Sequence, residues 1–223
     1  MDYKGLLLKN KSSTILKHIY ELFFPFFRTK RMNNFINVFQ PGKDTKIIDV
    51  GGTAYNWKII DINSKITLLN IITPDDERDL PNNYTLVEGD GTNMKYSDAE
   101  FDISFSNSVI EHLGTFERQK LFAQEACRVG EKIWVQTPAR SFFFEPHWLG
   151  LFIHYFPIRV QRKLVRYFTI RGLLIRPNQE YIDKFLAELR LLTYKEMQQL
   201  FPDCDVVVER FLGMAKAYIA VRK

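Results

Sequence analysis

The stretch FDISFSNSVIEHL, residues 101–113, joins a short apolar run to a polar end and the start of a helix. Similar apolar runs lie on both sides of it: KIIDV (46–50), ITLLN (66–70), YTLVEG (84–89) and KIWVQTP (132–138). Runs of this length, separated by helical or loop segments, are typical of buried parallel strands. The pattern predicts a doubly wound α/β fold around a mostly parallel sheet.

The C-terminal part predicts how that sheet ends. TYKEMQQLF (193–201) has the pattern of a helix, and CDVVVERF (204–211) and AKAYIAVRK (215–223) have the pattern of strands. Only Leu212, Gly213 and Met214 join the two strands. A turn this short forces an antiparallel pair, because parallel neighbours need a long crossover. The last strand is therefore expected to run against the others.

Two segments do not follow this alternation of strands and helices. Residues 1–42 are predicted to be an N-terminal helical segment, with an amphipathic helix over 16–27 that Pro25 ends or kinks and a second helix from Lys30 to Phe39. Residues 43–223 form the main domain. Within it, residues 139–192 are an aromatic and basic insertion after the fifth strand. Because open α/β sheets bind ligands at the carboxyl edge of their strands, this insertion is interpreted as a helical lid over the substrate.

Composition narrows the class of protein. The 223 residues are 46% hydrophobic with a net charge of +5, which favours a folded globular chain and permits an anionic partner without demanding one. Cys127 and Cys204 lie far apart, as expected for free thiols in a reducing cytoplasm. The apolar stretch 146–158 is shorter than the roughly 18 residues of a spanning helix. We therefore expect a cytoplasmic protein, and peripheral contact with a membrane stays open.

Polar and glycine residues follow each of the first four strands. Glycine lets a ligand approach the backbone, and small polar side chains at this edge can hold a nucleotide-like ligand. Plain turns and a helix cap explain the same residues without a ligand. The candidates for cofactor binding are Asp49, Gly51, Gly52, Thr53, Asn70, Asp90, Gly91 and Asn107.

In the order and spacing of these features the chain resembles the class I S-adenosylmethionine-dependent methyltransferases, most closely the type 11 branch. The resemblance rests on IIDVGGT, on EGDGTNMKYSDAEFDISFSNSVIEHL, on VQTP and on the closing strand pair. It implies a seven-stranded sheet with the last strand reversed and S-adenosylmethionine as the cofactor. It also implies that Gly51 and Gly52 lie near the methionine part, Asn70 near the ribose, Asp90 near the adenine amine and Asn107 near the sulfonium.

Two departures from the family pattern keep other functions open. The family loop is commonly Asp-x-Gly-x-Gly-x-Gly, and this chain has Thr53 and Tyr55 at the later glycine positions. The family usually has Asp or Glu where this chain has Asn70. A catalytically inactive partner subunit is therefore one alternative. A nicotinamide-dependent oxidoreductase fits less well, because GxGxxG is missing after the first strand.

The catalytic candidates are Glu145 and His147, on either side of Pro146. A carboxylate and an imidazole at this spacing can share a proton or orient a substrate, so His147 is a candidate general base or substrate ligand with Glu145 beside it. A rigid turn that anchors the lid is the alternative. Related ubiquinone-pathway O-methyltransferases hold a divalent metal with Glu-x-x-Glu-His. Ser108 stands in place of the first Glu here, so no metal is expected.

These features together predict methyl transfer to a small-molecule acceptor. By analogy with type 11 relatives, the acceptor atom is expected to be an oxygen of a saccharide or a lipid-linked substrate. Nucleic acid is not expected as a partner, because the basic residues form no tight cluster. The oligomeric state is left open.

Overall fold

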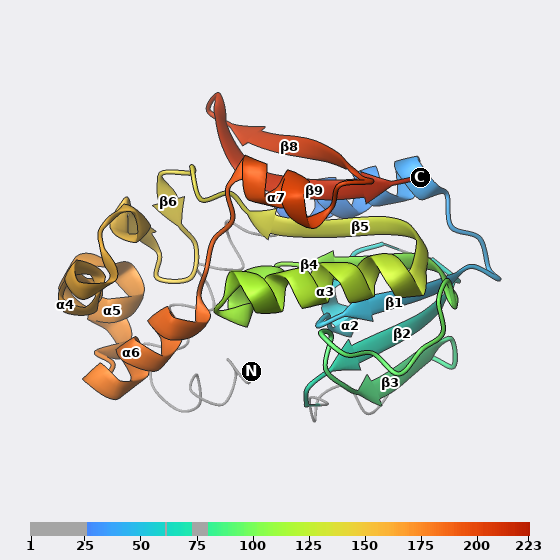
Figure 1. Ribbon diagram of the computed structural model, residues 1–223, viewed down its shortest axis with the longest axis horizontal. Helices are drawn as coiled ribbons and strands as arrows, with labels where there is room; N and C mark the ends of the chain where they lie inside the picture. The colour runs from blue at the N-terminus through green and yellow to red at the C-terminus, as the bar shows by residue number, and fades with distance from the viewer. Residues whose placement is uncertain (1–25, 61, 73–79) are drawn as a thin grey trace.

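The computed structural model describes residues 26–60, 62–72 and 80–223. Its centre is a seven-stranded sheet with the order β3-β2-β1-β4-β5-β9-β8, in which the first five strands of the chain are parallel (Figure 1). β9 runs antiparallel to both β5 and β8. The predicted fold and reversed final strand are confirmed. The strands are β1 (Lys46–Val50), β2 (Lys65–Asn70), β3 (Tyr84–Glu88), β4 (Phe101–Asn107), β5 (Gly130–Pro138), β8 (Asp205–Phe211) and β9 (Met214–Arg222).

The strand order defines where a ligand can enter. β1 lies in the middle of the sheet. The chain then adds β2 and β3 on one side of β1, and afterwards β4 and β5 on the other side. The loops that leave β1 and β4 therefore diverge at their carboxyl ends. In open α/β sheets this switch point is where ligands bind.

Helices cover both faces of the sheet, which makes the fold doubly wound. On one face, α3 (Phe116–Val129) and α7 (Tyr194–Leu200) contribute Phe122 and Met197 to the larger core. Each helix begins at a threonine whose side chain accepts a hydrogen bond from the first turn. On the other face lie α2 (Ala54–Trp57) and the helical residues 26–39.

Aromatic side chains hold the helical residues 26–39 to the sheet. Phe35 is fully buried, and its ring lies edge-on to Phe105 of β4, with the ring centroids 5.2 Å apart. Phe27 packs in the same way on Phe211 of β8. Residues 26–39 are all helical, so the start predicted at Lys30 is wrong. The other predicted N-terminal helix, over 16–27, lies almost entirely outside the described residues.

The insertion, residues 139–192, folds around a small core of its own at the end of β5 (Figure 1). Trp148, Val165 and Phe185 are among the buried residues of that core. None of the helices in the described part of the chain is long and apolar enough to cross a bilayer. The insertion contains β6 (Phe144–Glu145), β7 (Gly150–Leu151), the short helix η3 (Ile153–Tyr155), α4 (Ile158–Phe168), α5 (Ile170–Ile175) and α6 (Gln179–Glu188).

Candidate active site

The loop after β1 is tightly folded around a buried carboxylate. Asp49 is fully buried, and its Oδ2 accepts a hydrogen bond from Trp57 Nε1 at 2.8 Å. A Cβ atom at Gly52 would lie 1.9 Å from that same oxygen, so only glycine fits there. Gly51 has φ +77°, and a Cβ on it would lie 2.5 Å from Val109 Cγ1. The glycines therefore bring the loop against the segment that follows β4.

Asn70 fixes the same loop from the end of β2. Its Nδ2 donates a hydrogen bond to the carbonyl oxygen of Gly52 at 2.8 Å. Asn70 thus acts as an anchor for the loop, and its Oδ1 is the atom left to accept from a ligand hydroxyl. A carboxylate could not donate this bond, so the bond explains why an asparagine stands at this position.

The turn after β3 presents an ionised acceptor. Asp90 Oδ1 accepts hydrogen bonds from both the backbone and the hydroxyl of Thr92, each at 2.8 Å. Partial burial alone would raise the pKa of Asp90, but these bonds hold the pKa below its usual value. A Cβ at Gly91 would lie 2.7 Å from Val50 Cγ1, so the turn packs directly on the end of β1.

Asn107 is the last residue of β4 and lies at the same edge of the sheet. Its main hydrogen-bond partner was not predicted from the sequence. Its Oδ1 accepts a hydrogen bond from Arg31 Nη1 at 2.7 Å, and both residues are buried. The Arg31 guanidinium also contacts Glu209 of β8 at 3.2 Å, and Glu209 in turn pairs with Lys216. No local pattern could have revealed Arg31, because it lies 76 residues from Asn107 and 178 from Glu209.

The residues at this edge fit an adenosine-type cofactor. Asp49, Gly51, Gly52, Thr53 and Asn70 lie at the ends of the neighbouring strands β1 and β2 or in the loop between them, and Asp90 and Gly91 follow β3. The close-packed glycines leave backbone, not side chain, along the crevice. Thr53 precedes α2 with its side chain making no capping bond. The predicted roles of these residues toward the parts of the cofactor stay predictions.

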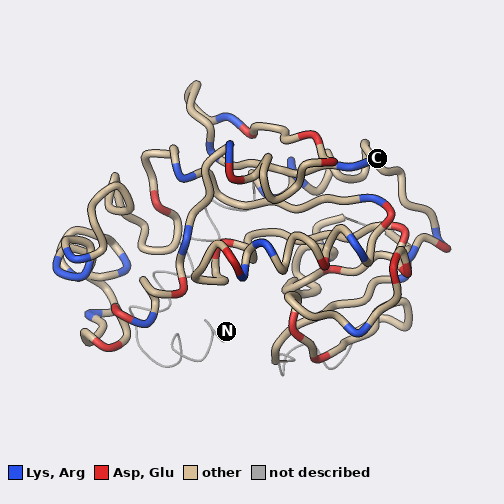
Figure 2. The backbone as a smooth tube through the Cα atoms, viewed as in Figure 1, with Lys and Arg blue, Asp and Glu red and all other residues tan. Residues whose placement is uncertain are grey.

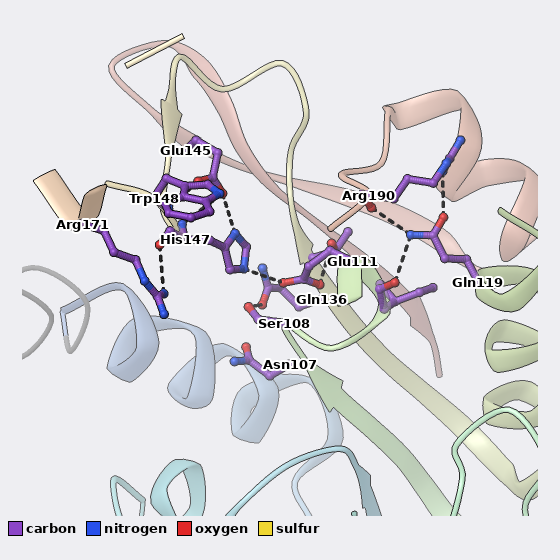
Figure 3. A network of polar contacts seen from close by, with 12 residues as sticks. Asn107, Ser108, Glu111, Gln119, Gln136, Glu145, His147, Trp148, Arg171 and Arg190 are labelled. Carbon is purple, nitrogen blue, oxygen red and sulfur yellow. Dashed lines mark hydrogen bonds and ion pairs between the residues drawn. The ribbon is translucent and has the colours of Figure 1, made fainter. Parts of the chain in front are cut away.

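Across the crevice, the insertion supplies a histidine held between two carboxylates. His147 Nδ1 lies 2.5 Å from Glu145 Oε1, and His147 Nε2 lies 3.8 Å from Glu111 Oε1 (Figure 3). Glu111 belongs to η2 (Ile110–Leu113), the short helix just after β4, and its Oε2 accepts from Thr137 of β5 at 3.0 Å. The two predicted catalytic residues are thus in direct contact, and the fold adds a third.

Burial and charge move the pKa values of this group in definite directions. Burial raises the pKa of the Glu111 carboxyl, since the attraction to His147 does not compensate for the lost hydration. Burial alone would lower the pKa of His147, but the negative charge of Glu145 beside it raises the pKa above 6.5. Burial alone would raise the pKa of Glu145, but the charge of His147 and the hydrogen bonds from His147 and the Trp148 backbone together lower it. The pair therefore favours an ionised Glu145 next to an imidazole that readily takes a proton.

A second histidine completes a group that could hold a metal. The ring of His112 lies edge-on to that of His147, with centroids 4.7 Å apart, and desolvation keeps the pKa of His112 well below 6.5. One ligand atom from each of Glu111, His112 and His147 lies within 4.8 Å of the others. The sequence pattern around Ser108 predicts no metal, but it does not include His147, which the insertion brings to this group. The sequence signal for the rest of the group was Glu111-His112 directly after β4.

Comparisons with known proteins address the domain and the fold of the chain. Residues 52–132 match the family model described as "Methyltransferase domain". No curated protein matches the chain by sequence.

Solved structures share the fold at low sequence identity. A protein of Haloferax volcanii, described as a methyltransferase candidate in complex with the Trm112 methyltransferase activator, has a TM-score of 0.54 and 8% identity over 99% of this chain and 96% of its own. Magnesium protoporphyrin IX methyltransferase of Synechocystis, with bound S-adenosylhomocysteine, has a TM-score of 0.52 and 9% identity over 87% and 83%.

A third solved structure also covers nearly the full length of the chain. It is a candidate S-adenosylmethionine-dependent methyltransferase of Methanococcus maripaludis, with a TM-score of 0.51 and 16% identity over 95% of this chain and 91% of its own. The family match gives the domain and the structural matches give the fold. Residues 52–132 therefore match a methyltransferase domain, the chain shares the fold of these solved structures, and S-adenosylmethionine is the cofactor that the matches indicate.

Proposed function

We propose that the chain transfers the methyl group of S-adenosylmethionine to a hydroxyl oxygen of a small acceptor, a saccharide or a lipid-linked substrate. One observation carries the choice of oxygen: His147 faces the carboxyl edge of the sheet with its Nδ1 held by a buried carboxylate. Amines and thiolates need no base for this reaction, whereas a hydroxyl is a poor nucleophile until its proton is removed. A partly exposed histidine paired with a buried carboxylate is suited to that task.

The roles of the residues follow from the geometry. The cofactor supplies an electrophilic methyl group on a sulfonium, and the protein orients the two reactants. Glu145 accepts the Nδ1 proton of His147, which fixes the tautomer and leaves Nε2 as the base. The acceptor hydroxyl gives its proton to Nε2, and the imidazolium that forms lies between Glu145 and Glu111. Two nearby carboxylates stabilise that charge without moving.

The class of acceptor is supported by the charge of the insertion. Between Pro146 and Gln179 the chain has six arginine or lysine residues and no aspartate or glutamate. Such a segment, next to His147, suits an acceptor with an anionic group, such as the phosphate that links many sugars to lipids. The saccharide itself is proposed by analogy with type 11 relatives.

A catalytically inactive partner subunit is the second candidate. Tyr55 stands where the family loop has a glycine, and Arg28 lies over its ring at 4.9 Å. Arg31 donates to the Oδ1 of Asn107, the residue predicted to lie near the sulfonium. Side chains from the helical residues 26–39 thus approach the edge that a cofactor would use. If the chain is an inactive partner subunit, it should fold and bind no cofactor.

Calorimetry with the purified full chain separates the two candidates. S-adenosylmethionine and S-adenosylhomocysteine are titrated, with NAD as the control nucleotide. Micromolar binding of the first two alone supports the enzyme and justifies a screen for methyl transfer to saccharides and lipid-linked sugars. Absence of binding at millimolar concentration contradicts the enzyme and supports the partner subunit.

A further inference from the structure

Large hydrophobic side chains are exposed in one short part of the insertion. Half of all such side chains in the described residues lie between 151 and 173, and Phe168 and Tyr167 are 70% and 62% exposed. We call these residues the aromatic–basic surface. Its exposed apolar members are Leu151, Phe152, Tyr155, Phe156, Ile158, Val160, Tyr167, Phe168, Ile170 and Leu173.

These exposed side chains do not belong to the insertion's own core. The inner side of α4 is already used, because Val165 is fully buried against the insertion's own core and Leu164 packs on it. Tyr167 and Phe168 end the same helix with their rings in solvent. Soluble proteins scatter single hydrophobic side chains over their surface, and a concentration of this kind marks an interaction site.

The charges between these side chains are all positive. Arg159, Lys163 and Arg176 are exposed, whereas Arg162 is paired with Asp183 of α6 and Arg171 is buried. Figure 2 shows Lys and Arg along α4 and α5 at the end of the molecule farthest from the C-terminus. The partner of this surface must therefore accept apolar side chains and carry negative charge.

We propose that the aromatic–basic surface binds the interface of an anionic lipid bilayer. Aromatic and aliphatic side chains enter the boundary between headgroups and acyl chains, while arginine and lysine contact the acidic headgroups. α4 has 11 residues, so it lies in the plane of the interface and does not cross it. Nucleic acid would satisfy the cations but would leave the aliphatic side chains in water.

The position of the surface relates it to the candidate active site. β7 joins the surface to the turn that carries His147, and the Gly150 backbone packs on Thr169 at the start of α5. The backbone N–H of Trp148 donates to Glu145 Oε2, so the turn and the insertion's core are one rigid unit. A chain docked through this surface holds His147 close to the membrane, where a lipid-linked acceptor is found. Membrane binding itself does not depend on the proposed reaction.

The experiment is vesicle co-sedimentation of the full chain. Vesicles of phosphatidylcholine alone are compared with vesicles containing about 30% phosphatidylglycerol. We expect binding to the anionic vesicles, weakening as salt is added, and little binding to phosphatidylcholine. The double variants Tyr167→Ser/Phe168→Ser and Arg159→Glu/Lys163→Glu should each weaken binding about tenfold or more.

Matched controls come from α3, on a different face. Leu121 is 49% exposed and Lys120 is exposed, so Leu121→Ser and Lys120→Glu make the same chemical changes outside the surface. They should leave vesicle binding unchanged. Circular dichroism shows whether each variant is folded.

Two outcomes overturn the proposal. The first is that the folded chain fails to bind anionic vesicles, or that the α3 variants reduce binding as much as the α4 variants. The second is that light scattering finds a dimer that Tyr167→Ser/Phe168→Ser dissociates while vesicles do not bind, which would assign the surface to a second copy. Neither result would affect cofactor binding, so the proposed function would still be tested separately.

Discussion

A single oxygen of Glu145 holds both the ring and the backbone of His147. Oε1 lies 2.5 Å from His147 Nδ1 and 3.0 Å from the backbone nitrogen of the same residue. Pro146 between the two restricts Glu145 to extended backbone, which turns its side chain back over the next residues. The imidazole is therefore fixed in direction, with Nε2 toward Glu111.

The first prediction concerns the pH dependence of the reaction. Glu145 raises the pKa of His147 above 6.5, and only the neutral imidazole can accept a proton. We expect kcat/KM to rise with pH, with a midpoint above 6.5. Glu145→Gln should move this midpoint to lower pH because it removes the negative charge. His147→Ala should lower kcat about 100-fold or more. The measurement is a pH–rate profile with the acceptor identified by the screen.

The control for this prediction is His154, the other histidine of the insertion. Its Nε2 contacts the Arg140 carbonyl oxygen at 3.0 Å. His154→Ala should keep the shape of the pH profile. If His147→Ala left turnover unchanged, Glu145 and His147 would have no catalytic role and would serve only to stabilise the turn.

The second prediction tests the loop after β1. In Gly52→Ala the new methyl group would lie 1.9 Å from Asp49 Oδ2, so the carboxylate or the loop must move. We expect affinity for S-adenosylmethionine to fall about tenfold or more, with a stability loss of about 1–3 kcal/mol from overpacking. Calorimetry and urea unfolding measure the two effects. Gly42→Ala is the control, since nothing lies within 4 Å of its added methyl group and both quantities should stay constant.

The third prediction concerns Asn70, where the family usually has a carboxylate. In Asn70→Asp the donor to the Gly52 carbonyl is lost and two oxygens face each other at the present 2.8 Å. We expect S-adenosylmethionine to bind several-fold more weakly, about threefold to tenfold, despite the change toward the family residue. Asn83→Asp breaks a similar bond, to Ser64, at the opposite edge of the sheet and should not alter binding. Tighter binding by Asn70→Asp would contradict the anchoring role.

The fourth prediction concerns the buried arginine. Arg31→Ala removes the partner of Asn107 and one partner of Glu209, although Lys216 still pairs with that carboxylate. We expect a loss of about 2–4 kcal/mol in the free energy of unfolding, since a buried charge loses a partner. Lys65→Ala, which breaks an ion pair whose partners are 59% and 91% exposed, should cost less than about 1 kcal/mol. Equal losses in the two variants would show that Arg31 is not structurally important.

The fifth prediction tests for a metal at Glu111, His112 and His147. His147 Nε2 lies 3.8 Å from Glu111 Oε1, a contact that the protonated imidazole makes without a cation. We expect extensive treatment with a chelator to leave methyl transfer and cofactor binding unchanged. Loss of activity that Mn²⁺ or Zn²⁺ restores would make His147 a metal ligand and remove its role as base.

Local patterns in the sequence were sufficient to predict the sheet and the edge that carries the candidate ligand-binding residues. The apolar runs predicted β1 to β5, and the short turn at Gly213 predicted the antiparallel β8–β9 pair, because strand periodicity and turn length act over neighbouring residues. The placement of Asp49, Asn70, Asp90 and Asn107 at strand ends followed from the same patterns.

Only the tertiary structure decided which side chains meet. Glu111 and His147 lie 36 positions apart in the sequence, and Arg31 is 178 residues from Glu209, so no periodicity links them. The insertion's core orients His147, and aromatic packing of the helical residues 26–39 brings Arg31 to Asn107. These contacts depend on how packed elements are placed in space. The sequence therefore determined the scaffold and the location of the candidate site, and the packing of its two flanking segments determined the charges within it.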